Sequence, residues 1–187
     1  MPNCRHVCLS LLIFNLLGCS IFQEEPAGPD ESRAMRAPGA QSSVWLGPKR
    51  EVSHYRTLFH GYDTVNYRLA AWESGDPEQP FTFRLLIDAH YGGARPRHYD
   101  LAKWADGSSR ATTGHKHEAE RCQLFNSMVS ACLFHDRAWL ELSRDELEDA
   151  RTAGLTLTLA SEAETYERIA IPAADIQSLL DAAAPAR

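Results

Sequence analysis

The sequence predicts an α+β fold, a mostly antiparallel β-sheet or sandwich with one or two C-terminal helices. Three observations predict it. Apolar and polar residues alternate over long stretches in the middle of the chain, which is the two-residue period of a half-buried strand. Turn residues separate these stretches, and helix start signals appear in the C-terminal third.

Two neighbouring segments have the clearest strand pattern. Residues 64–72 place Val65, Tyr67, Leu69 and Ala71 on one face, and residues 81–91 do the same with Phe81, Phe83, Leu85, Ile87 and Ala89. The stretch ESGDPEQP between them is rich in turn residues, so we expect an antiparallel hairpin.

Further strands are expected on both sides of the middle of the chain. Residues 97–104 predict a strand with Tyr99 and Leu101 inward, and residues 122–142 predict two more that join near Ser127. In the C-terminal third, residues 155–161 and 165–171 also alternate as strands.

Two helices are expected in the C-terminal third. Ser143 and Glu146 have the spacing of a capping box, and Gly154 is placed to end a helix over residues 144–153. Leu142 and Leu147 occupy the positions of a hydrophobic staple. Pro172 suits the first position of a last helix, whose apolar stripe consists of Ile176, Leu179 and Leu180.

The N-terminal segment has the pattern of an export signal. Arg5 precedes the uncharged run Val7 to Leu17, and a polar stretch begins a few residues later. The run is too short for the roughly 20 residues with which a helix spans a bilayer. We therefore expect residues 1–18 to be a signal peptide.

The four residues Leu16-Leu17-Gly18-Cys19 resemble a bacterial lipobox, the signature of lipoprotein signal peptides. In that family the cysteine is diacylated on sulfur and the chain is cleaved just before it. The resemblance covers only the first two dozen residues. It implies that Cys19 is lipidated and that residues 19–43, rich in Pro, Gly, Ser and charges, form a flexible tether. Residues 44–187 are then a single globular domain.

The resemblance also implies a location and partners. Two or three acyl chains hold a protein stably at a membrane surface without spanning it. Ser20 rather than Asp follows the cysteine, which favours the outer membrane, facing the periplasm, over the inner membrane. The expected partners are the membrane and another envelope protein. The net charge of −6 argues against a nucleic-acid partner.

Cysteine usage follows from the same resemblance. Cys4 and Cys8 leave with the signal peptide and Cys19 carries lipid, so Cys122 and Cys132 remain. In an oxidising envelope we expect these two to form a disulfide.

Candidate metal ligands lie in the segment GHKHEAE. His115 and His117 project from one face if the segment is extended, and Glu118 or Glu120 can add an oxygen ligand for zinc or copper. Such a pair needs a distant third ligand, so a solvated segment without a metal is the alternative.

A second candidate patch consists of Arg84, Asp88 and His90, which share the face opposite the phenylalanines. It suits an anionic ligand or an acid/base pair, and the alternative is a solvated face whose charges pair across strands. The leading hypothesis is a non-enzymatic binding or structural module. A metal-binding protein, a periplasmic hydrolase without recognisable motif, and a glycan-binding protein using the four tryptophans are the alternatives.

Overall fold

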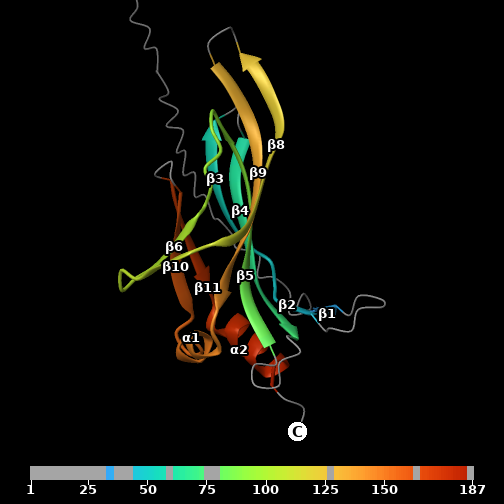
Figure 1. Cartoon of the computed structure of the whole chain (residues 1–187), viewed down its shortest axis with the longest axis vertical. Helices are drawn as coiled ribbons and strands as arrows, with labels where there is room; N and C mark the ends of the chain where they lie inside the picture. Colours follow the sequence, from blue (N-terminus) through green and yellow to red (C-terminus); the bar gives the residue numbers. More distant parts are fainter. Residues whose placement is uncertain are drawn as a thin grey trace, which may run out of the picture.

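The computed structural model describes residues 33–35, 44–57, 61–73, 81–125, 129–161 and 165–184. In this part of the chain the strands form two antiparallel sheets, with two helices at one end (Figure 1). The larger sheet, called the large sheet below, has the order β1-β2-β4-β5-β9-β8, with β3 also paired to β4. The smaller sheet has the order β11-β10-β6-β7. The predicted α+β fold class is confirmed.

The bounds of the elements are as follows. The large sheet contains β1 (Arg33–Met35), β2 (Val44–Leu46), β3 (Arg50–Thr57), β4 (Gly61–Glu73), β5 (Phe81–Gly93), β8 (Thr113–Phe125) and β9 (Val129–Leu142). The small sheet contains β6 (Leu101–Trp104), β7 (Ser109–Ala111), β10 (Leu155–Ala160) and β11 (Tyr166–Ile171). The helices are α1 (Arg144–Asp149) and α2 (Ala173–Ala182).

Both predicted hairpins are present. β4 pairs with β5 from Thr64 opposite His90 to Glu73 opposite Phe81, and β8 pairs with β9 along most of their length. The connecting residues 74–80 and 126–128, including the expected turn at Ser127, lie outside the described residues. β5 also pairs with β9, so the two hairpins form one continuous surface.

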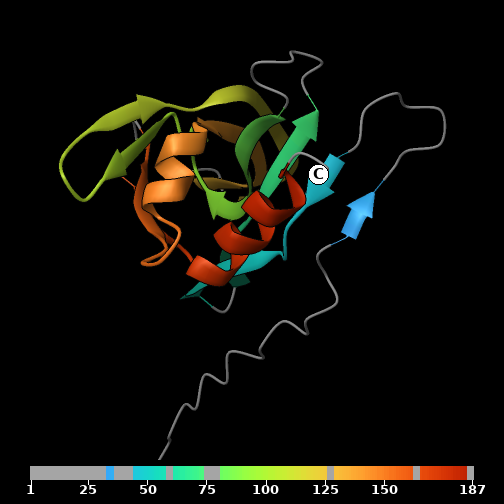
Figure 2. The same ribbon diagram turned by 90° about the horizontal axis from the view of Figure 1, so that it is seen from below.

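The inward faces of the two sheets enclose the core. The alternating residues that the sequence placed on one face of β4 and β5 are buried, apart from Phe81, which is half-buried. Leu85, Leu140, Leu159 and Ile169 are completely buried between the sheets. Viewed from below, the helices cover one end of this core (Figure 2), where the expected apolar residues Leu147, Ile176, Leu179 and Leu180 are buried.

Two connections hold the sheets together. The chain passes from β7 to β8 at the buried Thr112, whose hydroxyl donates to the carbonyl of Tyr99 at 2.6 Å. The hydroxyl of Tyr67 on β4 donates to the carbonyl of Ala170 on β11 at 2.9 Å. A separate contact joins the large sheet to α2: Arg50 on β3 makes a bidentate ion pair with Asp175, at 3.0 and 2.9 Å. The sheets and the second helix therefore form one packed unit.

Helix α1 is shorter than predicted. The capping box is present: the backbone N–H of Glu146 donates to the hydroxyl of Ser143, and the backbone N–H of Ser143 donates to the Glu146 carboxylate. The helix ends at Asp149, however, and residues 150–153 form turns. Gly154 has φ +78°, and an added Cβ would lie 2.6 Å from the carbonyl oxygen of Ile171. This close contact with β11 requires glycine where the chain turns into β10.

Two local predictions are wrong in detail. β6 begins at Leu101 because His98 adopts φ +52°, which interrupts the alternation. Tyr99 is buried as expected, but Leu101 is half-buried and Ala102 is the fully buried residue of β6. Pro172 is the N-cap of α2 rather than its first residue.

The N-terminal predictions fall mostly on residues that the structure leaves out. The signal peptide, Cys19 and most of the expected tether lie outside the described residues. Within residues 19–43, β1 pairs with β2, with Arg33 opposite Leu46. Neither described helix has the length and apolar character needed to cross a membrane.

Candidate functional site

The outward face of the large sheet is built of rows that run across its strands. Strand alternation points residues 84, 86, 88 and 90 of β5 away from the core. The pairing register then places His90 beside His135, with Glu118 opposite His135 on β8. In the next row Asp88 lies between Asn66 and Arg137.

Asp88, His90 and His135 form a cluster on this face, called the histidine cluster below. Oδ1 of Asp88 lies 2.9 Å from Nε2 of His90 and 3.2 Å from Nε2 of His135. The two imidazole rings are stacked, with centroids 4.0 Å apart, so both Nε2 atoms point to the same side. All three side chains are partly exposed. One carboxylate oxygen and two imidazole nitrogens thus converge at a position that solvent can reach.

The spacing of these atoms suits a transition-metal ion. The three ligand atoms lie within 4.8 Å of one another, and within the described part of the chain this is the one group of histidine, cysteine or acidic residues that does so. A tetrahedral zinc ion with bonds of 2.0–2.1 Å needs ligands about 3.3 Å apart. The distance from Asp88 to His135, 3.2 Å, has that size, and the distance to His90, 2.9 Å, is shorter; without an ion both contacts are hydrogen bonds or ion pairs.

Two glutamates of β8 lie behind the histidines. Oε1 of Glu120 lies 3.6 Å from Nδ1 of His135 and 3.9 Å from Nδ1 of His90, and Oε2 of Glu118 lies 3.8 Å from Nδ1 of His135. Hydrogen bonds from Lys116 and Arg137 lower the pKa of Glu118, so it is anionic at neutral pH. A carboxylate behind the second nitrogen of a histidine is the usual support of a metal-binding imidazole.

The predicted patch Arg84, Asp88 and His90 is only partly brought together. All three point outward from β5, but Arg84 lies two rows from Asp88, or about 13 Å along the strand. Its guanidinium group pairs with Glu141 at 3.2 Å and lies between the rings of Trp72 and Trp139. Asp88 and His90 are in the histidine cluster, and Arg84 is not.

The predicted pair His115 and His117 lies on the opposite face of β8. Their rings are stacked 5.6 Å apart, which confirms that they share a face. Nδ1 of His117 lies 3.0 Å from Asp136, and its Nε2 lies 3.0 Å from Nδ1 of His98. Nε2 of His115 lies 3.0 Å from the carbonyl of Thr112. Both imidazoles thus have protein partners already.

Glu118 and Glu120 do not join His115 and His117. Alternation along β8 turns the glutamates to the outward face, where they lie beside His135 and His90. The carboxylates expected to complete one metal site therefore support another. The sequence alone assigned His135 to no site, because only the pairing of β5 with β9 brings it opposite His90.

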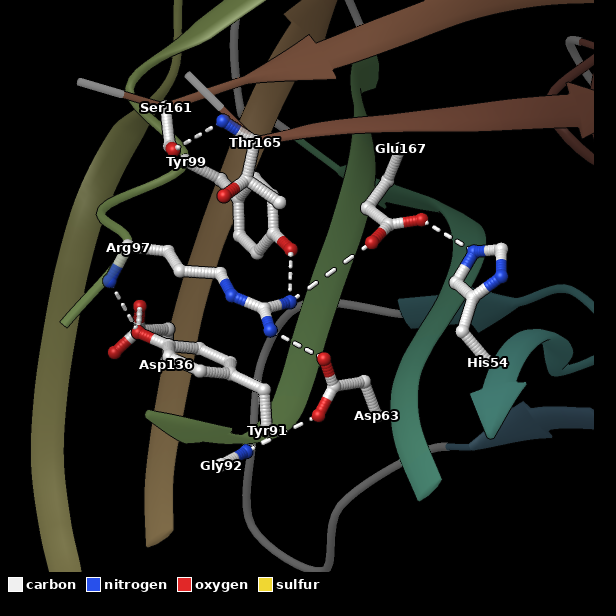
Figure 3. A network of polar contacts seen from close by, with 10 residues as sticks. All are labelled: His54, Asp63, Tyr91, Gly92, Arg97, Tyr99, Asp136, Ser161, Thr165 and Glu167. Carbon is white, nitrogen blue, oxygen red and sulfur yellow. Dashed lines mark hydrogen bonds and ion pairs between the residues drawn. The ribbon is translucent and has the colours of Figure 1, made fainter. Parts of the chain in front are cut away.

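A second polar group lies between the sheets (Figure 3). Arg97, Asp63 and Glu167 are each more than nine-tenths buried. The Arg97 guanidinium group donates to Asp63, donates to the Tyr99 hydroxyl at 3.2 Å, and lies 3.9 Å from Glu167. It also stacks over the ring of Tyr91 at 4.4 Å. We call these five residues the buried arginine network.

The network extends to the surface at two points. Glu167 lies 2.7 Å from Nε2 of His54, whose side chain is half exposed. The Tyr91 hydroxyl donates to Asp136, which borders His117. Burial, with the charges of Glu167 and Asp63 adding to it, raises the pKa of Tyr99 to about 12, although Arg97 opposes the shift. Burial also raises the pKa of Tyr91. Both hydroxyls are therefore protonated at neutral pH.

The expected disulfide is present. Cys122 on β8 and Cys132 on β9 are directly opposite in the register, and their sulfur atoms are bonded at 2.04 Å. In the chain-entropy estimate such a bond, closing about eleven residues, stabilises the fold by about 2.5 to 3 kcal/mol. It fixes the end of the hairpin that carries His135, Glu118 and Glu120.

The four tryptophans do not form one platform. Trp45 and Trp104 pack against the core, whereas Trp72 and Trp139 border Arg84 on the outward face. Comparison with known proteins adds no relative: no family model matches the chain, and no curated protein or solved structure matches it significantly. Functional inference therefore depends on the chemistry of the residues described above.

Proposed function

We propose that this chain is a lipid-anchored protein of the cell envelope that binds a divalent transition-metal ion, zinc or copper, through Asp88, His90 and His135. The observation that carries the proposal is the convergence of three ligand atoms on the outward face of the large sheet. A carboxylate oxygen and two imidazole nitrogens are ligands that both ions accept. A water molecule would complete the coordination.

Support for the metal also comes from the surroundings of the ligands. The acidic groups near the cluster attract a cation. Glu120 lies 3.9 Å from Nδ1 of His90 and 3.6 Å from Nδ1 of His135, and Glu118 lies 3.8 Å from Nδ1 of His135, so a carboxylate stands beside the second nitrogen of each imidazole when Nε2 binds metal. Because the side chains lie on paired strands rather than on a loop, their backbones hold a fixed separation.

The envelope location rests on the lipobox resemblance of Leu16 to Cys19. A lipid anchor followed by a short tether would keep the domain near its membrane and near another envelope protein. No catalytic motif supports a hydrolase, and we propose a binding role. Mass spectrometry of the mature N-terminus tests the anchor: acyl groups on Cys19 are expected, and a free thiol there would contradict it.

Calorimetric titration of the EDTA-treated protein with zinc, and separately with copper, tests the metal site. We expect one ion per chain and at least a tenfold loss of affinity in the variant His90→Ala/His135→Ala. The matched control is His115→Ala/His117→Ala, which removes two histidines from the opposite face and should retain the affinity. The proposal fails if neither metal binds, or if only the control variant loses binding. Circular dichroism of each variant checks that it is folded.

A further inference from the structure

A groove of about 560 Å³ lies on the outward face of the large sheet, next to the histidine cluster. Leu86 of β5 and Trp139 of β9 lie side by side in the groove, and Arg68 of β4 is the neighbour of Leu86 on its other side. Asn66 and Arg137 border it in the row of Asp88. A groove of this volume is within the range of small-molecule sites.

The groove is positively charged. Lys49, Arg68, Lys116 and Arg137 line it, against the single lining carboxylate of Asp88. Glu118 pairs with both Lys116 and Arg137, at 2.5 and 3.1 Å, and so compensates one of their two charges. Among the described residues, Lys49 and Arg68 have no carboxylate within ion-pair distance. The two basic residues of the groove that have no ion pair in the described part of the chain therefore lie at its β4 side.

Asn66 lines the same groove and has a buried acceptor atom without a partner. The residue is 7% exposed, and its Oδ1 atom has no hydrogen-bond partner in the described structure. Most buried polar atoms have a partner, and leaving one without costs about 1–3 kcal/mol. A ligand hydroxyl that donates to Oδ1 would remove this cost.

Trp139 supplies an aromatic surface whose position is fixed by its neighbours. Gly114 on β8 has φ +63°, and a Cβ there would lie 1.6 Å from the indole ring. The ring thus occupies the space that any other side chain at position 114 would fill. Arg84 stacks on it at 4.9 Å. Sugar rings commonly pack their C–H face on such a surface, since it is apolar and rigid.

We infer that the groove binds a sugar phosphate. The phosphate group pairs with Arg68 and Lys49, since a guanidinium group matches two phosphate oxygens at once. A sugar hydroxyl donates to Oδ1 of Asn66, and the ring packs on Leu86 and Trp139. This site uses side chains other than the two histidines of the metal proposal and does not require a bound ion.

Calorimetry of the full chain in the presence of EDTA tests the inference, with glucose 6-phosphate, inorganic phosphate and glucose as separate probes. We expect glucose 6-phosphate to bind at least tenfold more tightly than either of the other two. The variants Arg68→Gln and Lys49→Gln should each weaken it by at least fivefold. Arg95→Gln, an exposed arginine outside the groove, is the matched control and should bind as the parent does.

Three outcomes would overturn the inference. The first is the absence of saturable binding of glucose 6-phosphate. The second is equal affinity for phosphate and glucose 6-phosphate, which would leave an anion site without a sugar subsite. The third is an unchanged affinity in both groove variants. Because every titration contains EDTA, none of these outcomes depends on whether the histidine cluster binds metal.

Discussion

The interior between the sheets and the outward face of the large sheet use the same kinds of charged residue differently. Between the sheets, Asp63, Arg97 and Glu167 are more than nine-tenths buried, and both carboxylates contact the guanidinium group of Arg97. On the outward face, Asp88 and His90 are each more than 40% exposed at their side chains, and their contacts leave room for a further ligand. The charged residues between the sheets thus have a structural role, whereas those on the outward face are available for binding.

The physical reason is the cost of removing a charge from water. A buried ion must be paired and hydrogen-bonded, so its capacity for partners is used up by the protein. A half-exposed ion is stabilised by solvent, and its pairs contribute only about 0–1 kcal/mol. Such groups can exchange protein partners for a metal or an anion at little cost.

Removing Arg97 should have the largest effect on stability. The variant Arg97→Ala leaves Asp63 and Glu167 buried without their cation, which typically costs about 3–5 kcal/mol. Urea denaturation followed by tryptophan fluorescence measures the loss.

Two controls for Arg97 sharpen the comparison between the faces. Arg95→Ala, two residues away and exposed, should change the free energy of unfolding by no more than about 0.5 kcal/mol. His90→Ala on the outward face should stay within about 1 kcal/mol. A loss in His90→Ala as large as that in Arg97→Ala would remove the distinction between the two regions.

Replacing Gly114 should show that Trp139 is tightly packed against β8 at this part of the outward face. Gly114→Ala puts a methyl group into the indole of Trp139 at a backbone φ of +63°. We expect a loss of about 3 kcal/mol, the sum of the left-handed backbone cost and of overpacking.

The matched control for this variant is Gly107→Ala. Gly107 has φ +87° but no atom within 4 Å of an added Cβ, so only the backbone cost of about 1–2 kcal/mol applies. Thermal unfolding of both variants gives the difference. Equal losses would mean that Trp139 moves away freely and does not form a fixed wall of the groove.

Stability should fall at alkaline pH because of the buried tyrosines. The folded-state pKa of Tyr99, about 12, lies above its unfolded value of 10.0, so the neutral hydroxyl is favoured by folding. This contribution is complete below pH 10 and is lost as the pH rises toward 12, by about 2 kcal/mol. Urea midpoints at pH 9 and pH 11.5 measure the change. In Tyr99→Phe the fall should be smaller, and an unchanged fall would contradict the assignment to Tyr99.

Much of the fold could be predicted because its signals are local. Alternation from Val65 to Ala89 determines which side chains are buried, and the Ser143–Glu146 capping box determines where a helix begins. The helix ends at Asp149, five residues before Gly154, and the glycine at position 154 is instead required by its close contact with Ile171, 17 residues further along the chain. Sequence patterns near residue 154 contain no sign of that contact.

The candidate site was predicted only in part, because its residues come from strands far apart in the chain. Alternation correctly placed Asp88 and His90 together, and His115 with His117. It could not show that β9 lies beside β5, which brings His135 to His90. The orphaned acceptor of Asn66 likewise depends on three-dimensional packing.

Anomalous diffraction at the zinc edge, from crystals of the full chain grown with one equivalent of zinc, tests the central claim most directly. We expect a peak within about 2.0–2.2 Å of Oδ1 of Asp88 and of Nε2 of His90 and His135. A peak at His98, His115 or His117 instead, or no peak at any of these residues, would contradict the assignment of the outward face as the metal site.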